Sequence, residues 1–532
     1  MESDWRCVWL ASLLCWLAAC SDDGGTEVVA DPVRTSDGGT RDATVRGGKP
    51  TDRGGDDDAL PDDDGDEERD AGARDRDGGA GDAAVALPDG QRLQDRRQFT
   101  IDPSSLPFFA LSEPTVPTDR WAGQLEGAGY RIEVPSNWNG QLVMYAHDYQ
   151  GVNAALSVRS PSLRRHLVEQ GFAWAASSFT RNYYDVRAGV EDTNALALAF
   201  TRIAEENGRK LAVPTKIYVL GHAMGGHVAG AAVERETEQT ARNKVHYHGA
   251  LAMCGVMGDL ELFRYFAAYQ AAAHQLAGVP ITRWPVADFQ AVRGRLVTAL
   301  YTSFPSLTTP LGDRLRTVVM NLSGGARPLF EQGFTSNEQA NVWNAFAGDA
   351  WLFGVLRDPT VDTRAVVYQL DGDPSVNTDE MALNRTVFRV HAVSDDMLNP
   401  PRPDGLRWVP PVHGDFAVPV ITLHTLGDVL VPFSMQQVYR RRALDKGRGE
   451  LLVQRAIRAA GHCEFTLAEQ IAAFDALVAW EQRGVKPDGD EVLDAAVVSA
   501  PTYGCKFTDH RTTLDDPPLL RNARASMPAC AP

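Results

Sequence analysis

A strand, turn and helix motif near the middle of the chain has the residues that expose a catalytic nucleophile, except for the nucleophile itself. The segment Ile217–His227 is an apolar run followed by a tight turn in which Gly221 and Gly225 flank Ala223. The central residue of such a turn is usually a serine with its hydroxyl exposed above a sheet, and the glycines allow close approach of neighbouring backbone. Ala223 offers only a methyl group. The pattern therefore predicts a nucleophile elbow that lacks its nucleophile.

Two further side chains follow the elbow in the chain order nucleophile, acid, histidine, which resembles one of the orders known for hydrolytic triads. Asp428 follows the predicted strand 418–424, and His462 follows the predicted strand 451–457. An acid after the penultimate strand and a histidine after the last one would let the carboxylate accept a proton from the imidazole and support its cationic form. We therefore predict that Asp428 and His462 are the acid and the base that belong with position 223.

The chemistry also requires an oxyanion hole. One backbone N–H would come from Met224, which follows the nucleophile position, and a second from Tyr149 in the loop 145–151. Asp148 is a departure in this loop, because a carboxylate opposes the negative charge that develops on a carbonyl oxygen. If Asp148 points away into solvent, the N–H of Tyr149 can still serve.

We predict no metal or other cofactor at the site. His222 and His227 flank the elbow, but they have no matching set of cysteines or carboxylates, so packing roles are favoured. The aspartates of the segment 371–379 have no spacing that matches a calcium-binding loop, which favours a solvated turn.

The predicted elements place these residues on an α/β frame. From residue 98 onward, short apolar runs alternate with helical patterns, which is typical of a mostly parallel sheet with crossover helices. Strands are predicted at 130–134, 142–146, 172–177, 216–220, 248–254, 418–424 and 451–457. Helices are predicted at 192–207, 226–236, 260–276 and 435–446, and a last one opens with a capping box of Thr466 and Glu469.

A long segment separates Cys254 from Val418. At about 160 residues it is too long for a loop, so we predict a mostly helical cap over 259–415. Aromatic and small residues recur in it at helical spacing, namely Trp343, Phe346, Ala350 and Phe353. Such a stripe could line a pocket for an aromatic or acyl group, but it is more typical of a core that the cap forms by itself.

The elbow, the Asp428 turn and Gly461-His462-Cys463 together resemble the α/β-hydrolase superfamily, in particular secreted bacterial esterases in the neighbourhood of feruloyl esterases, tannases and polyester depolymerases. The resemblance covers nearly all of residues 120–485. It implies an α/β-hydrolase fold with the cap inserted between the sixth and seventh core strands. It also implies serine-dependent hydrolysis of a small or polymeric carboxylic ester, with peptide hydrolysis as the alternative chemistry. The loop 145–151 departs from the His-Gly pattern that is usual in such proteins.

Three interpretations of Ala223 remain open. The chain could be an altered copy of a serine hydrolase, a natural ligand-binding or scaffold protein on a disabled enzyme frame, or a slow enzyme in which Asp428 and His462 activate water. Loss of the serine typically costs about 10⁶ in turnover. Asp148 is a second departure that a single engineered change does not explain, so a natural alanine is favoured.

The first hundred residues are expected to export and tether the folded part. Residues 1–20 resemble a bacterial lipoprotein signal, in which Cys20 would carry a lipid. The lipid would anchor the protein to a membrane, with the folded part on the side of the periplasm or the cell exterior. The segment 21–97 is rich in Asp and Gly and poor in large apolar residues, which predicts a disordered linker. Of the net charge of −18, residues 1–20 contribute −1 and residues 21–100 contribute −11, which leaves −6 for the rest. No basic patch suggests a nucleic-acid partner.

Four cysteines fall outside the signal, and an exported location would permit disulfides between them. They allow three pairings. Cys505 with Cys530 would staple an irregular tail over 486–532, and Cys254 with Cys463 would tie the loop beside His462. The core itself is divided by the cap into the parts 98–258 and 416–485.

Overall fold

The computed structural model describes residues 96–112, 116–286, 288–346, 361–391, 399, 405–527 and 530. The predicted signal with Cys20, nearly all of the predicted linker, and the cap residues Ala350 and Phe353 lie outside these ranges. Within them, no helix combines the length and the apolar character that crossing a membrane requires.

The core is an eight-stranded sheet with the order β12-β11-β8-β7-β4-β6-β3-β2. Its strands are β2 (Thr118–Leu125), β3 (Ala128–Pro135), β4 (Gln141–Ala146), β6 (Ala173–Ser177), β7 (Lys216–His222), β8 (Gly249–Met253), β11 (Val420–Thr425) and β12 (Leu452–Ile457). β3 pairs antiparallel with β2 and with β6, and all the other neighbours are parallel. A mostly parallel sheet with crossover helices and a sharp turn after a central strand is an α/β-hydrolase fold, as predicted.

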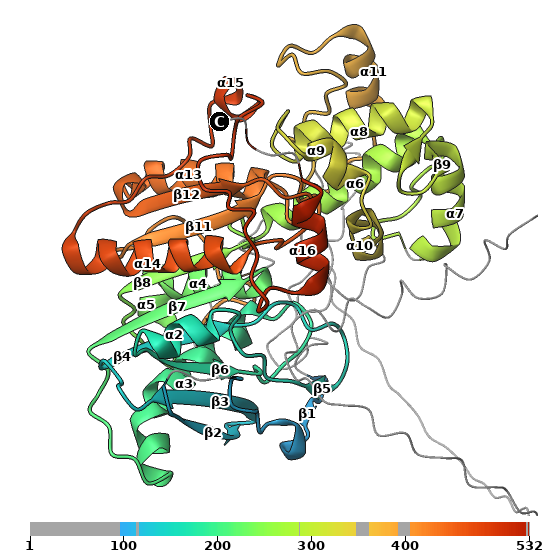
Figure 1. Cartoon of the computed structure of the whole chain (residues 1–532). Coiled ribbons are helices and arrows are strands. Elements are labelled where there is room, and N and C mark those ends of the chain that lie inside the picture. Colours follow the sequence, from blue (N-terminus) through green and yellow to red (C-terminus); the bar gives the residue numbers. More distant parts are fainter. Residues whose placement is uncertain are drawn as a thin grey trace, which may run out of the picture. The chain divides into compact units, whose positions relative to one another are not determined.

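Helices cover both faces of this sheet (Figure 1). Alternate residues of each strand face opposite sides, so Leu142 and Met144 pack in one apolar cluster while Val143 and Tyr145 pack in another. One face is covered by α3 (Val186–Glu206), α4 (Met224–Ala232) and α13 (Ser434–Asp445), and the other by α2 (Arg164–Glu169) and α14 (Leu467–Arg483).

Several boundaries differ from those that the sequence pattern suggests. α3 begins six residues earlier than predicted, because Asp185 caps it by accepting a hydrogen bond from the N–H of Ala188. α4 ends at Ala232, and a separate short helix, α5 (Arg235–Thr240), follows it. β2 was not predicted, since this edge strand mixes exposed and half-buried residues without clear alternation. The capping box at the start of α14 is confirmed.

The described residues of the segment between β8 and β11, which we call the insertion, contain far more helix than strand. Its elements are α6 (Glu261–Leu276), α7 (Phe289–Leu300), β9 (Tyr301–Ser303), β10 (Leu307–Thr308), α8 (Pro310–Leu322), α9 (Phe330–Phe334), α10 (Glu338–Ala345) and α11 (Thr378–Thr386). Trp343 is fully buried and packs edge-on or tilted against other aromatic rings, those of Phe289, Tyr301, Phe304 and Phe346. These rings form a core for the insertion helices.

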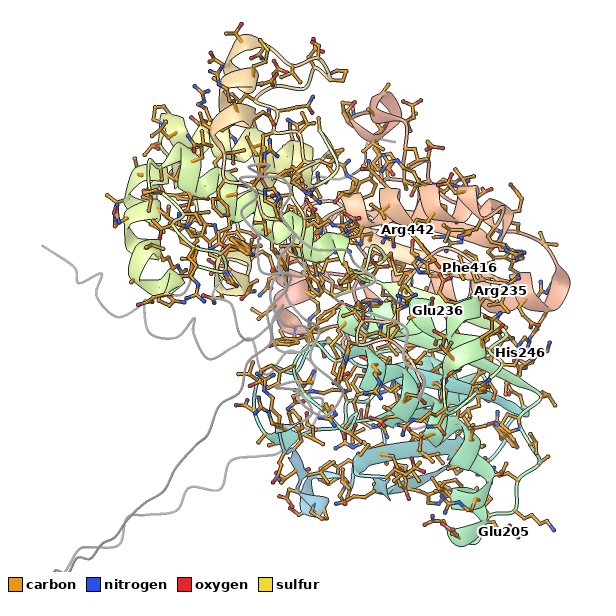
Figure 2. All side chains as sticks on the ribbon, turned by 180° about the vertical axis from the view of Figure 1, so that it is seen from behind. Glu205, Arg235, Glu236, His246, Phe416 and Arg442 are labelled. Carbon is orange, nitrogen blue, oxygen red and sulfur yellow. A yellow bond between two sulfur atoms is a disulfide. The ribbon has the colours of Figure 1, made fainter. Side chains whose placement is uncertain are left out.

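The end of the insertion returns to the core. A β-bridge joins Glu234 to Phe416, and the backbone N–H of Arg235 donates to the carbonyl of Asp415. Arg235 and Phe416 lie next to each other at this junction (Figure 2). The last residues that we assigned to the cap therefore pack on the sheet domain.

The C-terminal segment is more regular than predicted. It contains α15 (Ala495–Val498) and α16 (Pro518–Ala525), and Cys505 is bonded to Cys530. Arg524 of α16 is buried and forms an ion pair of 2.6 Å with the buried Glu469 of α14. This pair attaches the tail to the core. Away from it, β1 (Thr100–Ile101) pairs with β5 (Ala155–Leu156) in a separate two-stranded sheet.

Candidate active site

The predicted site residues follow the carboxyl ends of neighbouring strands. The loop with Asp148 follows β4, Ala223 follows β7, Asp428 follows β11 and His462 follows β12. The strands β4, β7, β8, β11 and β12 are adjacent and parallel. Their carboxyl ends therefore lie along one edge of the sheet, which is where open α/β sheets bind ligands.

The elbow has the strained backbone that was predicted from its glycines. Ala223 has φ +52° and ψ −115°, a conformation that residues with a Cβ rarely adopt. A Cβ on Gly221 would lie 2.1 Å from the carbonyl oxygen of Gly225, and a Cβ on Gly225 would lie 2.1 Å from that of Ala146. The N–H of Ala223 donates to the carbonyl of Met253 at 2.9 Å, which ties the turn to the end of β8. The turn is intact although it carries no hydroxyl.

Asp428 and His462 are in direct contact. Nδ1 of His462 lies 2.6 Å from Oδ2 of Asp428. The other carboxylate oxygen, Oδ1, accepts the N–H groups of Leu430 and Val431, each at 2.9 Å. Asp428 is fully buried, so its oxygens are held in one orientation. With Nδ1 facing the carboxylate, Nε2 is the ring nitrogen that remains for a proton transfer.

A disulfide brings this imidazole to the elbow. Cys254 and Cys463 are bonded, and a ring nitrogen of His462 lies within 4.8 Å of both sulfur atoms. Cys254 follows Met253, whose carbonyl accepts the N–H of Ala223. The imidazole therefore lies beside Cys254, the residue next to the one that accepts the N–H of Ala223. The two cysteines and His462 are not a metal site as they stand, because the thiols that would ligate are bonded to each other.

The charges around His462 favour its protonated form. Burial lowers the pKa of His462, but the charge of Asp428 and its hydrogen bond to the ring, together with the charges of Glu338 and Asp148, outweigh burial, so that the pKa is raised overall. The three carboxylates come from three different segments of the chain. An imidazolium ion is thus better accommodated here than in water.

Asp148 does not point away into solvent. It is half-buried, and its Oδ1 accepts a hydrogen bond from the side-chain amide of Gln150. Burial lowers the pKa of both His462 and His222, and the charge of Asp148 acts against this lowering in both. The carboxylate is therefore within electrostatic reach of the site, where it would oppose an oxyanion.

The two expected oxyanion donors occupy suitable elements. Met224 is the first residue of α4, and the first N–H groups of a helix have no partner within it. Tyr149 lies in the loop after β4 and is half-buried, and burial raises the pKa of its phenol. The N–H of Met224 and the loop of Tyr149 lie at the same edge of the sheet as the elbow.

His222 and His227 both have polar partners other than a metal. The ring of His227 contacts the carbonyl of Pro410 at 2.8 Å and the hydroxyl of Tyr184 at 2.9 Å. His222 contacts Oε1 of Gln470 at 3.2 Å and the hydroxyl of Tyr145 at 3.3 Å. These contacts agree with the packing roles that the spacing suggested.

Sequence reasoning missed the residues that the insertion contributes. Oε1 of Glu338 accepts the backbone N–H of His462 at 3.3 Å, and Nε of Arg327 donates to the carbonyl of Leu426 at 2.7 Å. A Cβ on Gly333 would lie 1.7 Å from the carbonyl oxygen of Gly427. The residues 327–338 are thus fitted against the turns that carry Asp428 and His462. No motif in the sequence marks them.

Comparisons with known proteins give distant similarities. No family model matches the chain. It is similar to the o-phthalyl amidase of Xanthobacter agilis, with 22% identity over 416 residues that cover 66% of this chain and 85% of that protein. Similar solved structures include feruloyl esterase B from Aspergillus oryzae, at 15% identity, with 74% of this chain and 86% of that chain covered and a TM-score of 0.40. The rice cell wall degrading esterase LipA from Xanthomonas oryzae is also 15% identical, with 67% and 85% covered and a TM-score of 0.29.

Proposed function

We propose that the site is that of a serine-dependent carboxylic ester hydrolase in which Ala223 has removed the covalent route. Turnover by the chain as written is then absent or very weak. The observation that carries the proposal is the 2.6 Å contact between His462 and the buried Asp428, held beside an elbow whose residue 223 keeps the strained φ of +52°.

With a serine at position 223, each remaining group would have a defined role. The serine oxygen would attack the ester carbonyl carbon while Nε2 of His462 takes its proton, and the same proton would then go to the leaving alkoxide. Water would repeat the sequence on the acyl-enzyme and release the acid. Asp428 would orient the imidazole, and the N–H groups of Met224 and Tyr149 would stabilise the oxyanion.

Without that serine, two outcomes remain. His462 could activate water for direct attack, a route that lacks the covalent intermediate and would be slower by about 10⁶. Alternatively, the chain is a binding or scaffold protein that recognises an ester-like ligand and releases it unchanged. The intact glycine turn is compatible with both outcomes.

A second candidate reaction is hydrolysis of an aromatic amide. The similarity to an o-phthalyl amidase, which spans 85% of that protein, supports testing this bond class beside esters. The same triad serves both bonds, because His462 would protonate a leaving amine as it would an alkoxide.

The test compares Ala223→Ser with the parent on short and aromatic nitrophenyl esters and on o-phthalyl amides. Activity in the serine form alone supports a disabled hydrolase, and the preferred bond identifies the substrate class. A serine form that also carries His462→Ala is the control and should lose the restored activity. No activity in either form, with ligand binding intact, would support a binding protein instead.

We further propose that the protein is exported and anchored to a bacterial membrane through a lipid on Cys20, with residues 21–97 as the tether. Two disulfides support an oxidising location outside the cytoplasm. Replacing Cys20 with Ser should move the protein from the membrane fraction to the soluble fraction. An unchanged distribution would contradict the lipid anchor.

A further inference from the structure

We propose that Glu338 is a positioning residue for His462. Its carboxylate accepts the backbone N–H of His462 and adds its negative charge to those of Asp428 and Asp148 around the imidazole, so that the insertion helps to set the charge state of the base. The inference concerns the same site as the proposed function and rests on it for its catalytic meaning. The contact itself does not depend on which bond, if any, is hydrolysed.

The geometry leaves His462 as the main partner of this carboxylate. Glu338 is only 3% exposed, at the first position of α10. Oε1 accepts from the N–H of His462 at 3.3 Å, and Oε2 accepts from the side-chain amide of Asn341 at 3.4 Å. Both contacts are long for hydrogen bonds. Neither compensates fully for removing a charged carboxylate from water.

An opposite charge on His462 explains why a glutamate is tolerated there. Burial raises the pKa of Glu338 to about 7, and the charge of His462 acts to lower it. In the other direction, the charge of Glu338 acts to raise the pKa of His462. The two groups therefore titrate as a coupled pair. When Glu338 loses its proton, the resulting negative charge makes the imidazole of His462 bind its own proton more tightly.

Other titratable groups lie around this pair. The charges of Asp428 after β11 and Asp148 after β4 act on His462, and His462 acts in turn on His222 at the end of β7 and His424 within β11. Burial lowers the pKa of both of these histidines to about 4, and Arg327 of the insertion acts on Asp428. Asp428 and Asp148 are fixed on the sheet domain. Glu338 is the one among the three carboxylates acting on His462 that comes from the insertion.

The insertion holds Glu338 in place through the residues just before it. Gly333 lies so close to Gly427 that a Cβ would be 1.7 Å from its carbonyl oxygen, and Arg327 donates to the carbonyl of Leu426. The hydroxyl oxygen of Ser336 accepts the backbone N–H of Glu338 at 3.1 Å. A movement of α10 away from the sheet domain would thus remove a negative charge from the imidazole.

The experiment is an NMR titration of histidine ring signals in the full chain, with the His462 signal identified by its loss in His462→Gln. Glu338→Gln keeps an oxygen that can accept the N–H of His462 but removes the charge. We expect His462 to titrate at a lower pH in this variant than in the parent. The matched control is Glu380→Gln, which removes another fully buried carboxylate of the insertion, one that caps α11. It should leave the titration of His462 unchanged.

Equal titration of His462 in Glu338→Gln and in the parent would overturn the proposal. If Glu338→Gln does not fold, the parent alone decides. Its His462 ring signal must then follow a titration curve that departs from that of a single independent group, and a curve that fits one group would contradict the coupling.

A kinetic comparison separates this proposal from the proposed function. In the Ala223→Ser form, Glu338→Gln should shift the acid limb of kcat/KM to lower pH, whereas a purely structural defect would lower kcat/KM at every pH. If Ala223→Ser proves inactive, the proposed function fails, and the ring titration still decides the role of Glu338.

Discussion

At the scale of single residues, the turn at Ala223 keeps its strained shape without a hydroxyl group at its centre. A non-glycine residue at positive φ costs on the order of 1 kcal/mol or more and persists where its surroundings fix it. Here the surroundings are the close contacts of Gly221 and Gly225 and the hydrogen bond from Ala223 to Met253. None of them involves a side chain at position 223. The turn therefore keeps its shape with a methyl group at position 223, and we expect it to hold a serine side chain placed there in the same orientation.

The charge around His462 predicts an unusual pH dependence for the Ala223→Ser form. A general base must be neutral, and the pKa of His462 is raised because Asp428, Glu338 and Asp148 outweigh the effect of burial. The value of kcat/KM should therefore rise with pH through an inflection above 6.5, the ordinary pKa of histidine. The measurement is kcat/KM for one nitrophenyl ester from pH 5 to 9. An inflection at or below 6.5 would show that the carboxylates do not control the base.

The predictable part of the site is the part that a local motif encodes. Ala223, Asp428 and His462 each follow a strand in a recognisable turn, so their order along the chain predicted that they would meet, and His462 and Asp428 are in contact. Glu338 and Arg327 have no such signal. They reach the site because the insertion packs against the two turns, and single-sequence patterns do not encode how two packed elements fit together.

At the scale of elements, α9 packs against the turn that carries Asp428, here called the acid turn. Of the contacts around the site, this one leaves the least room for an added side-chain atom. Gly333 leaves no room for a methyl group beside Gly427, whereas Gly294 in α7 has nothing within 4 Å of an added Cβ. We expect Gly333→Ala to lower the free energy of unfolding by about 1–3 kcal/mol through overpacking. Gly294→Ala should raise it by up to about 1 kcal/mol, because alanine is the better helix former.

Thermal or chemical unfolding of both variants beside the parent checks this pair. The Gly333 variant should also disturb the ring signal of His462, since the displaced turn carries Asp428. Equal stability of the two variants would mean that α9 is free to move away from the acid turn.

The same scale explains which elements the sequence predicted well. Buried parallel strands such as β4 and β7 are short apolar runs between turn residues, and the capping box of α14 is a local pattern. β2 was missed, because this edge strand mixes exposed and half-buried residues and has no apolar run. The start of α3 was missed because its cap, Asp185, lies before the periodic segment.

At the scale of the whole molecule, buried ionisable groups link stability to pH. Burial raises the pKa of Glu234 to about 8, and those of Glu338 and Glu469 to about 7. The folded state then holds these protons more tightly than the unfolded chain does. Their contribution to stability is complete below the ordinary glutamate pKa, and it is lost as the pH rises through 7 to 8.

Buried histidines with a lowered pKa, such as His424, act in the opposite direction and in another pH range. Burial lowers the pKa of His424 to about 4, so its contribution is present above 6.5 and is lost as the pH falls towards 4. The two effects oppose each other in mildly acidic solution. Above pH 6.5 the glutamates act without this opposition, and the raised pKa of His462 adds to the loss as the pH rises.

We therefore predict that the free energy of unfolding falls between pH 6.5 and pH 9. The pKa of Glu234 lies about 1.5 pH units above pH 6.5. At ~1.4 kcal/mol per unit, the loss of its proton alone lowers the free energy of unfolding by roughly 2 kcal/mol. Denaturant unfolding at the two pH values measures the fall, and Glu234→Gln should make it smaller, since this variant has no carboxylate to ionise at that position. Stability that is constant or rises over this range would mean that Glu234, Glu338 and Glu469 are already ionised at pH 6.5, each with its charge compensated by the hydrogen bonds around it.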